Sequence, residues 1–220
     1  MMAVNFCAIL FAYRVFGKRG LFIWIPLSVI VANIQVLKTV ELFGFTSTLG
    51  NIVYASSFLV TDILSENYGK KEAKKAVAIG FFSLIIMTVL MNIALIFKPS
   101  PEDFAQESLS VIFSFMPRIA LASLGAYWVS QTHDVWAYDF WKKKFPSDKF
   151  IWLRNNASTM ISQLIDSVLF TLIAFWGVYR LPLLLEITVT TYVMKWIVAV
   201  LDTPFLYISK RIQKTLDEKK

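Results

Sequence analysis

The sequence predicts an all-α integral membrane protein, a bundle of six to seven transmembrane helices. Apolar residues make up 57% of the 220 residues, above the roughly 45–50% that is usual in soluble domains. Charged residues make up 17%, below the roughly 25% of soluble domains, and the mean hydropathy is +0.60. We therefore expect residues 1–220 to form a single transmembrane domain.

Several apolar runs approach the ~20 residues that a bilayer-crossing helix needs. The predicted spans lie near 2–16, 21–41, 48–66, 76–97, 109–137, 155–178 and 185–208. The first run is short for a full crossing, and it has neither a basic leader nor a clear cleavage site, so a signal peptide is not expected. Gly69 follows the third span, and a glycine with positive φ there is expected to end that helix.

Positive charges gather in alternate loops, which predicts the direction of each span. The basic residues cluster in four segments, 14–19, 70–75, 142–154 and 210–220. The segments between them are acidic or nearly uncharged, as at Glu41, Glu102 and Asp103. Basic loops stay in the cytoplasm, so we expect a cytoplasmic C-terminus. The net charge of +7 thus indicates orientation in a lipid bilayer, and no nucleic-acid partner is expected.

Ionisable residues interrupt the apolar runs, although a charge inside a bilayer costs several kcal/mol unless it is paired or hydrated. They are Lys38, Asp62, Arg118, Asp134, Asp166, Lys195 and Asp202. Uncharged polar residues such as Asn33, Asn51 and Ser123 accompany them. All are expected to face the bundle interior or a cavity, and Asp166 is expected to neutralise Arg118 or Lys195. The alternative is that the uncharged polar groups only join packed helices.

A short pattern, S-Q-x-x-D, occurs twice, as "SQTHD" at 130–134 and "SQLID" at 162–166. Residues three apart share a helical face, so Gln131 should point with Asp134, and Gln163 with Asp166. Given the loop charges, the two glutamines fall at similar depth, and the two pairs can line one cavity. Amide and carboxylate groups suit a planar ligand with adjacent N–H donors and a carbonyl, such as the edge of guanine.

An aromatic face such as that of Tyr54 could stack on such a ligand. Other polar solutes would also suit this array. The alternative is that both pairs only lock the two helices together.

Four stretches resemble the queuosine precursor transporter family, also called the vitamin uptake transporter family. They are "GFTSTLGNIVYASSFLVTDILSENYGKKEA" (44–73), "PRIALASLGAYWVSQTHDVWAYDF" (117–140), "NNASTMISQLIDSVLFTLIAFWG" (155–177) and "TTYVMKWIVAVLDTPFLY" (190–207). The resemblance implies a multi-pass protein of the bacterial cytoplasmic membrane that imports 7-cyano-7-deazaguanine or 7-aminomethyl-7-deazaguanine. The positions that match its motifs are Asp62, Arg118, Ser123, Gln131, Asp134, Asp166 and Lys195. His133 stands where the family more often has an apolar residue, so we expect it to pack between helices.

Other functions remain as alternatives. The sequence contains no G-x-x-x-x-G-K-[ST] motif, so no P-loop ATPase is present. A substrate-binding subunit of an energy-coupling-type vitamin or nucleobase importer, with a separate ATPase, is the main alternative. A membrane enzyme is disfavoured because there is one histidine and neither H-x-x-x-H nor C-x-x-C occurs; a receptor or scaffold is equally disfavoured. No cofactor or metal is expected, and the oligomeric state stays open, with a homo-oligomer among the alternatives.

Overall fold

The computed structural model describes residues 1–42, 44–145 and 151–218. Some side chains within helices lie outside that description, namely those of residues 55–56, 134–135, 138–139, 142, 151–159, 199–200, 203 and 217. The described residues form eight α-helices and one β-hairpin, which confirms the helical fold class. The chain divides into two compact units, Met1–Pro117 with Val193–Lys220, and Arg118–Tyr192.

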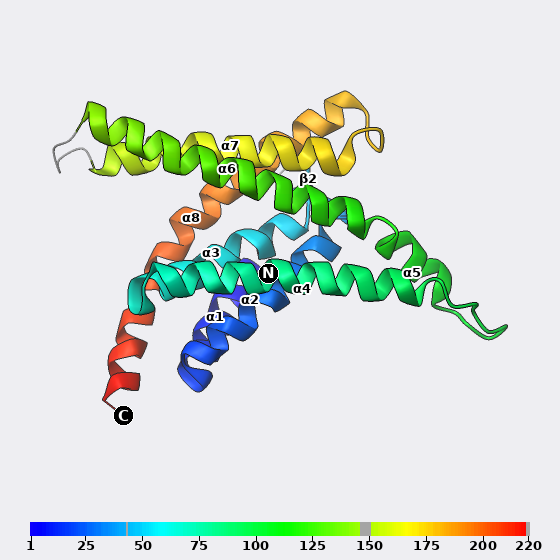
Figure 1. Ribbon diagram of the computed structural model, residues 1–220, viewed down its shortest axis with the longest axis horizontal. Coiled ribbons are helices and arrows are strands. Elements are labelled where there is room, and N and C mark those ends of the chain that lie inside the picture. Colours follow the sequence, from blue (N-terminus) through cyan, green and yellow to red (C-terminus); the bar gives the residue numbers. More distant parts are fainter. Residues whose placement is uncertain (43, 146–150, 219–220) are drawn as a thin grey trace. The chain divides into compact units, whose positions relative to one another are not determined.

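The first unit is built around a core of packed helices (Figure 1). Its helices are α1 (Met2–Phe16), α2 (Lys18–Gln35), α3 (Gly50–Tyr68), α4 (Lys70–Ala94), α5 (Gln106–Phe113) and the last part of α8 (Leu181–Asp217). Helix α2 contacts α1, α3 and α4, and α3 also contacts α1 and α4. Gly69 ends α3 with φ +92°, which confirms the expected helix end.

A glycine in α3 and a glycine in α4 allow these two helices to pack closely against α2. A Cβ atom on Gly50 of α3 would lie 2.2 Å from the carbonyl oxygen of Ala32 in α2. A Cβ atom on Gly80 of α4 would lie 2.8 Å from the Ile25 side chain. Small residues let helix backbones approach in this way inside membranes. The packing of the first unit therefore depends on the absence of side chains at these two positions.

A β-hairpin separates α2 from α3. Strands β1 (Thr39–Leu42) and β2 (Phe45–Thr48) pair antiparallel, with Thr39 opposite Thr48. Threonine and valine favour extended backbone, and Gly44 adopts φ +82° at the turn. The predicted span 21–41 was therefore wrong at its end, since α2 stops at Gln35. Lys38 is exposed and outside any helix, so it is not a charge within a span.

The second unit contains α6 (Met116–Lys144) from Arg118 onward, α7 (Ile151–Phe175) and the first part of α8. The predicted span 109–137 is divided, because α5 ends at Phe113 and α6 begins at Met116. Pro117 lies in the first turn of α6. Proline is tolerated in the first turn of a helix because the backbone N–H groups there have no intrahelical acceptor. The proline thus favours a helix start where the hydropathy suggested one continuous run.

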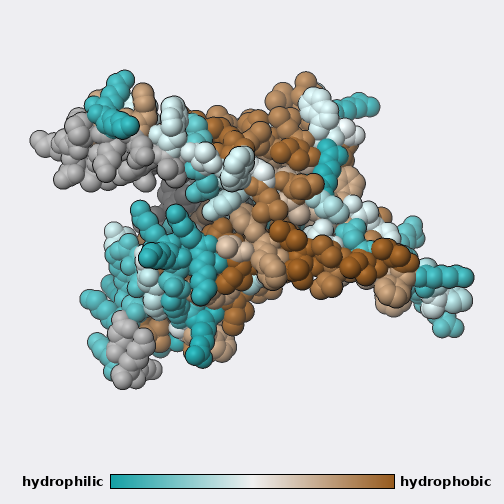
Figure 2. All heavy atoms as spheres, in the orientation of Figure 1, coloured by the Kyte–Doolittle hydropathy of each residue, from teal (hydrophilic) through white to brown (hydrophobic). Residues whose placement is uncertain are grey.

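Three of the described segments are long and apolar enough to cross a membrane, namely Lys70–Ala94, Gln106–His133 and Leu181–Val198. The apolar segments Met2–Phe16 and Met160–Phe175 are shorter. Figure 2 shows hydrophobic residues along α4 beyond its lysine-bearing first turns. Phe82, Val89 and Leu90 are exposed on this helix, as expected of a surface in contact with lipid. The number of six to seven spans stays a prediction.

Helices α1, α3 and the end of α8 run in the same direction within the first unit. The Phe6 and Phe205 rings lie 4.8 Å apart, and further along both helices the Tyr13 hydroxyl hydrogen bonds to Gln213. Lys210 forms an ion pair with Glu66 near the end of α3, at 2.6 Å. The C-terminal ends of these three helices therefore lie together, and they bring their basic residues to one end of the unit.

Candidate functional site

Helices α6 and α7 form an antiparallel pair whose register is fixed by side-chain hydrogen bonds. Arg118 at the start of α6 reaches the end of α7, Ser130 Oγ donates to Asp166 Oδ1 at 3.4 Å, and His133 Nδ1 lies 3.0 Å from Ser162 Oγ. Figure 1 shows the two helices side by side. These polar contacts follow one another along a single line between the two helices, which we call the α6–α7 seam.

The centre of the α6–α7 seam is the Asp166 carboxylate, which is 8% exposed. Three residues earlier on α7, Gln163 Oε1 is buried and has no hydrogen-bond partner within the described part of the chain. Buried polar atoms are nearly always hydrogen-bonded. Two acceptors, a carboxylate and an amide oxygen, thus lie one helical turn apart, and the amide oxygen is able to accept a donor from a ligand.

The two S-Q-x-x-D motifs meet across this seam, where their serines make hydrogen-bond contacts with the opposite helix. Ser130 of the first motif donates to Asp166 of the second, and Ser162 of the second contacts His133. The predicted similar depth of Gln131 and Gln163 agrees with this register. Gln131, however, is exposed, because successive residues on a helix point about 100° apart. The predicted role of Gln131 in binding is untested.

Ser123 and Asp134 are two further residues of α6 that were predicted to line the binding site. Ser123 is buried, 8% exposed, on the same helix. The side chain of Asp134 lies outside the described residues, so its expected role stays a prediction. His133 contacts α7 through Ser162 and packs on Trp136, with the ring centroids 5.7 Å apart, as expected of a histidine that joins helices.

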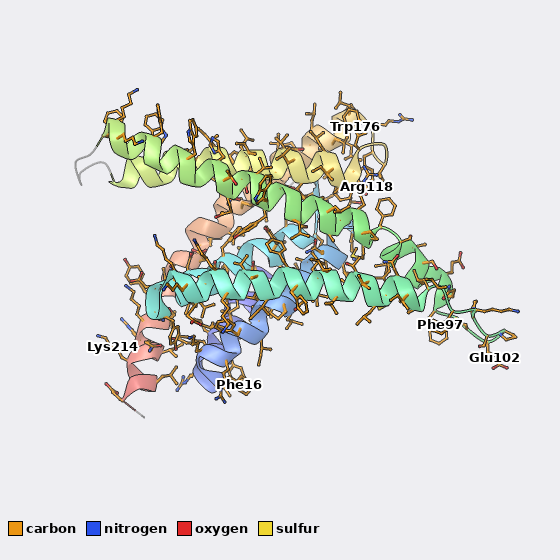
Figure 3. All side chains as sticks on the ribbon, in the orientation of Figure 1. Phe16, Phe97, Glu102, Arg118, Trp176 and Lys214 are labelled. Atoms are coloured by element: carbon orange, nitrogen blue, oxygen red, sulfur yellow. The ribbon has the colours of Figure 1, made fainter. Side chains whose placement is uncertain are left out.

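Arg118 is paired with backbone carbonyls instead of the expected carboxylate. Its Nε donates to the Ile173 carbonyl at 2.7 Å and its Nη2 to the Trp176 carbonyl at 2.5 Å, and Figure 3 labels Arg118 and Trp176 at this end of the pair. The last carbonyls of a helix have no intrahelical donor and carry partial negative charge. The expectation that Arg118 has a carboxylate partner was therefore wrong, which leaves Lys195 as the candidate partner of Asp166. Pairing of Asp166 with Lys195 stays a prediction.

The first unit holds a second set of predicted residues. Lys195 of α8 is 5% exposed, and its ammonium lies 5.9 Å from the centroid of the Tyr54 ring on α3. Two turns further along the same helices, Asp202 is 7% exposed and lies close enough to Asp62 for their charges to interact. Asp62 itself is exposed. A cation and two carboxylates thus follow one another along the α3–α8 contact.

Asn33 and Asn51, also predicted to bind a ligand, make local hydrogen bonds. Asn33 Nδ2 donates to the Val29 carbonyl at 2.7 Å, and Asn51 Nδ2 donates to Thr48 Oγ1 at 2.8 Å. Both residues are buried. Asn51 thereby ties the start of α3 to the end of β2, which is a structural role; a role in binding is untested. No group of three or more His, Cys, Asp or Glu side chains that could hold a metal ion occurs among the residues described.

Residues 48–209 match the family model described as "Putative vitamin uptake transporter". The chain belongs to the vitamin uptake transporter family. Over 209 residues, this transporter is 46% identical to a Bacillus subtilis (strain 168) protein named "Probable queuosine precursor transporter", covering 95% of this chain and 91% of the relative. Membership identifies a membrane protein that transports, and not an enzyme.

Two more distant relatives carry related names. This transporter is 29% identical over 163 residues to a Haemophilus influenzae (strain ATCC 51907 / DSM 11121 / KW20 / Rd) "Probable queuosine precursor transporter", covering 74% of this chain and 66% of the relative. It is 27% identical over 173 residues to the Escherichia coli (strain K12) "Queuosine precursor transporter", covering 77% and 75%. No solved structure matches it.

Sequence reasoning missed three residues that the structure places at polar contacts of this transporter. Ser130 and Ser162 open the two repeated motifs, yet only the glutamines and aspartates were selected as ligands. Asp202 was recognised as an intramembrane charge but not as a site residue. Helical spacing held the signal in two of the three cases, because Ser130 follows buried Ser123 by two turns, and Asp202 follows Lys195 by the same seven residues.

Proposed function

We propose that this transporter imports a queuosine precursor, 7-cyano-7-deazaguanine or 7-aminomethyl-7-deazaguanine, across the bacterial cytoplasmic membrane. The observation that carries the substrate class is the 46% identity to a relative named for a queuosine precursor, over 95% of this chain. The resemblance of the motifs around 44–73 and 117–140 supports the same class. The choice between the two deazaguanines is left to the experiment below.

The chemistry of the α6–α7 seam supports a guanine-like ligand. Such a base presents N1–H and an exocyclic NH₂ side by side, and both are donors. Asp166 and Gln163 offer two acceptor groups one turn apart, of which Gln163 Oε1 has no partner among the described residues. A hydrogen bond to a carboxylate is worth ~1.5–3 kcal/mol. We propose that the Asp166 carboxylate accepts a hydrogen bond from the donor edge of the base, and that Gln163 Oε1 accepts a hydrogen bond from a neighbouring N–H of the same base.

The proposal gives the remaining predicted residues positioning or path-lining roles. Lys195 and Tyr54 already form a cation–π contact, which can hold the Tyr54 ring in place for stacking. Asp62 and Asp202 lie close enough to interact further along the α3–α8 contact. These two carboxylates are candidates for carrying a coupling cation or proton.

Uptake by the purified full-length protein tests this function. Liposomes that contain the protein and no ATPase should take up radiolabelled 7-aminomethyl- or 7-cyano-7-deazaguanine faster than protein-free liposomes do. Unlabelled guanine is added as the competing base in the same assay. Expression should also restore growth or queuosine formation in a bacterium that depends on salvaging the precursor. Uptake only when an ATPase partner is supplied would instead favour the energy-coupling subunit. No uptake in either case would contradict the proposal.

We also propose that the C-terminus lies in the cytoplasm, because basic residues gather in the segments 14–19, 70–75, 142–154 and 210–220, and basic loops stay on the cytoplasmic side. Glu102 lies in the segment between α4 and α5, and Lys214 lies on the basic end of α8. In a Cys7→Ser background, a cysteine at position 102 should react with a membrane-impermeant thiol reagent in intact cells, and one at position 214 should react only after lysis. The reverse pattern would overturn the orientation.

A further inference from the structure

A cavity of about 260 Å³ lies at the basic end of the first unit. It is lined by Arg14 of α1 and by five residues of α8, which are Ile208, Arg211, Ile212, Thr215 and Leu216. Figure 3 labels Phe16 at the end of α1 and Lys214 on the last turns of α8, which mark this end of the unit. The cavity is separate from the residues considered above for the substrate.

The lining is cationic on one side and apolar on the other. Two of its six residues are arginines, three are isoleucine or leucine, and none is acidic. In the described part of the chain, neither Arg14 nor Arg211 has an ion-pair or hydrogen-bond partner through its guanidinium, whereas the nearby Lys210 is paired with Glu66. Two unpaired guanidinium groups facing one cavity repel each other and favour an anion between them. Planar guanidinium groups bind phosphate oxygens through two parallel hydrogen bonds.

The apolar side distinguishes between sources of that phosphate. Phe11 lies one turn before Arg14 on α1 and is 67% exposed, and Ile208 on α8 is 43% exposed. These side chains continue from the cavity along the apolar parts of their helices, where acyl chains would lie in a membrane. A phospholipid bound through its phosphate would place its acyl chains along these side chains, whereas a free anion would make no contact with them. The cavity is also smaller than the ~300–1,000 Å³ of sites for drug-sized ligands, which favours a headgroup.

We propose that this cavity binds the phosphate of an anionic phospholipid, with Arg14 and Arg211 as ligands and the isoleucines and leucine beside the start of the acyl chains. Basic pockets between transmembrane helices commonly hold such headgroups. The lipid would join the end of α1 to the end of α8, which are far apart in sequence. Its binding is therefore coupled to the docking of α8 in the first unit and stabilises the folded protein.

Thermal unfolding of the purified protein in neutral detergent tests the proposal. Phosphatidylglycerol should raise the Tm of the unchanged protein, and phosphatidylcholine should not. In the Arg14→Gln/Arg211→Gln variant, the concentration of phosphatidylglycerol that gives the half-maximal shift should rise roughly 30-fold, which corresponds to about 2 kcal/mol. The matched control is Lys71→Gln/Lys214→Gln, which removes the same charge from this end of the unit and should change that concentration less than threefold.

Three results would overturn the proposal. An equal loss in the lysine control would show diffuse attraction of charge instead of a site. Equal stabilisation by inorganic phosphate at the same concentration would show a site for a free anion. Equal stabilisation of the unchanged protein by phosphatidylglycerol and phosphatidylcholine would show that the cavity does not select anionic lipids. This comparison uses only the unchanged protein, so it decides the question even if the arginine variant does not fold.

Discussion

The two compact units of this transporter hold their helices together in different ways. In the first unit, α2 packs against α3 and α4 through glycines whose Cβ atoms would collide with the neighbouring helix. In the second unit, α6 and α7 are joined by side-chain hydrogen bonds, of which Ser130 to Asp166 is buried and Arg118 to two carbonyls closes one end. Glycines of the second unit have more room, since a Cβ on Gly125 would meet nothing nearer than 3.9 Å.

This difference distinguishes the helix contacts that support the fold from the contacts that a ligand can replace. Backbone contact leaves no space for a ligand and fixes the helices rigidly. Polar contacts between helices in a membrane are weaker, averaging roughly 0.6 kcal/mol in measured cases. They can be exchanged for contacts with a ligand. We therefore expect substitutions at the glycines to act on stability, and substitutions of Ser130 or Asp166 in the buried part of the α6–α7 seam to act mainly on binding. Arg118 at the end of the seam is the exception, because its two hydrogen bonds are charge-assisted.

The largest effect on stability is expected for Gly50→Ala. The added Cβ would lie 2.2 Å from the Ala32 carbonyl oxygen and 2.7 Å from the Val36 nitrogen, so backbone must move. Overpacking of this kind costs about 1–3 kcal/mol, and we expect the upper end in the free energy of unfolding. Gly125→Ala is the matched control and should be neutral or stabilising, since alanine favours helix by up to ~1 kcal/mol. Equal losses at both positions would remove the contrast between the units.

Arg118→Met should have the next largest effect. It removes two charge-assisted hydrogen bonds to the Ile173 and Trp176 carbonyls. Bonds to charged groups are worth ~1.5–3 kcal/mol each, but water near a helix end replaces part of that, so we expect a loss of about 2 kcal/mol. Arg118→Lys should retain part of the stability, because lysine keeps the positive charge but lacks the planar guanidinium group that donates to both carbonyls. If Arg118→Met leaves the Tm unchanged while abolishing binding, Arg118 contacts substrate instead of closing the helix pair.

The smallest effect on stability is expected for Ser130→Ala. Its bond to Asp166 is long, at 3.4 Å, and its single hydroxyl proton has a nearer acceptor in the Tyr127 carbonyl, at 3.1 Å. A net hydrogen bond of this kind contributes roughly 0.5–1 kcal/mol. The melting temperature should therefore fall by only a few degrees, as circular dichroism can measure. The affinity for the deazaguanine should change because Asp166 loses a group that orients it. A large fall in stability with unchanged affinity would make the α6–α7 seam a purely structural contact.

The sequence allowed a good prediction of where helices lie, and a poorer one of which side chains meet. The run 2–16 coincides with α1, and 48–66 differs from α3 by two residues at each end, because apolar runs and loop charges report directly on lipid contact. Residues 39–41 of the hairpin were assigned to the second span because hydropathy does not distinguish strand from helix over so few residues. The interruption between α5 and α6, at residues 114–115, was missed for a similar reason.

The geometry of the site is harder to predict from the sequence than the positions of the helices. Successive residues on a helix point about 100° apart, so a shift of one residue changes which side chain faces the neighbouring helix. Gln131 was expected in the cavity, yet its neighbour Ser130 contacts Asp166. Arg118 was expected to need a carboxylate, but the unpaired carbonyls at a helix end served equally well. The partner of Arg118 depends on how α6 and α7 pack against each other. The spacing of residues along one helix carries no information about that packing.

The central claim is that Asp166 in the α6–α7 seam binds the substrate. The direct test is equilibrium binding of 7-aminomethyl- and 7-cyano-7-deazaguanine to Asp166→Asn, with Glu102→Gln as a control that removes an exposed carboxylate elsewhere. Loss of a charge-assisted hydrogen bond of ~1.5–3 kcal/mol should weaken binding roughly 10- to 150-fold, while the Tm stays within a few degrees of the unchanged protein. A variant that melts much lower yet binds with unchanged affinity in its folded fraction would contradict the account.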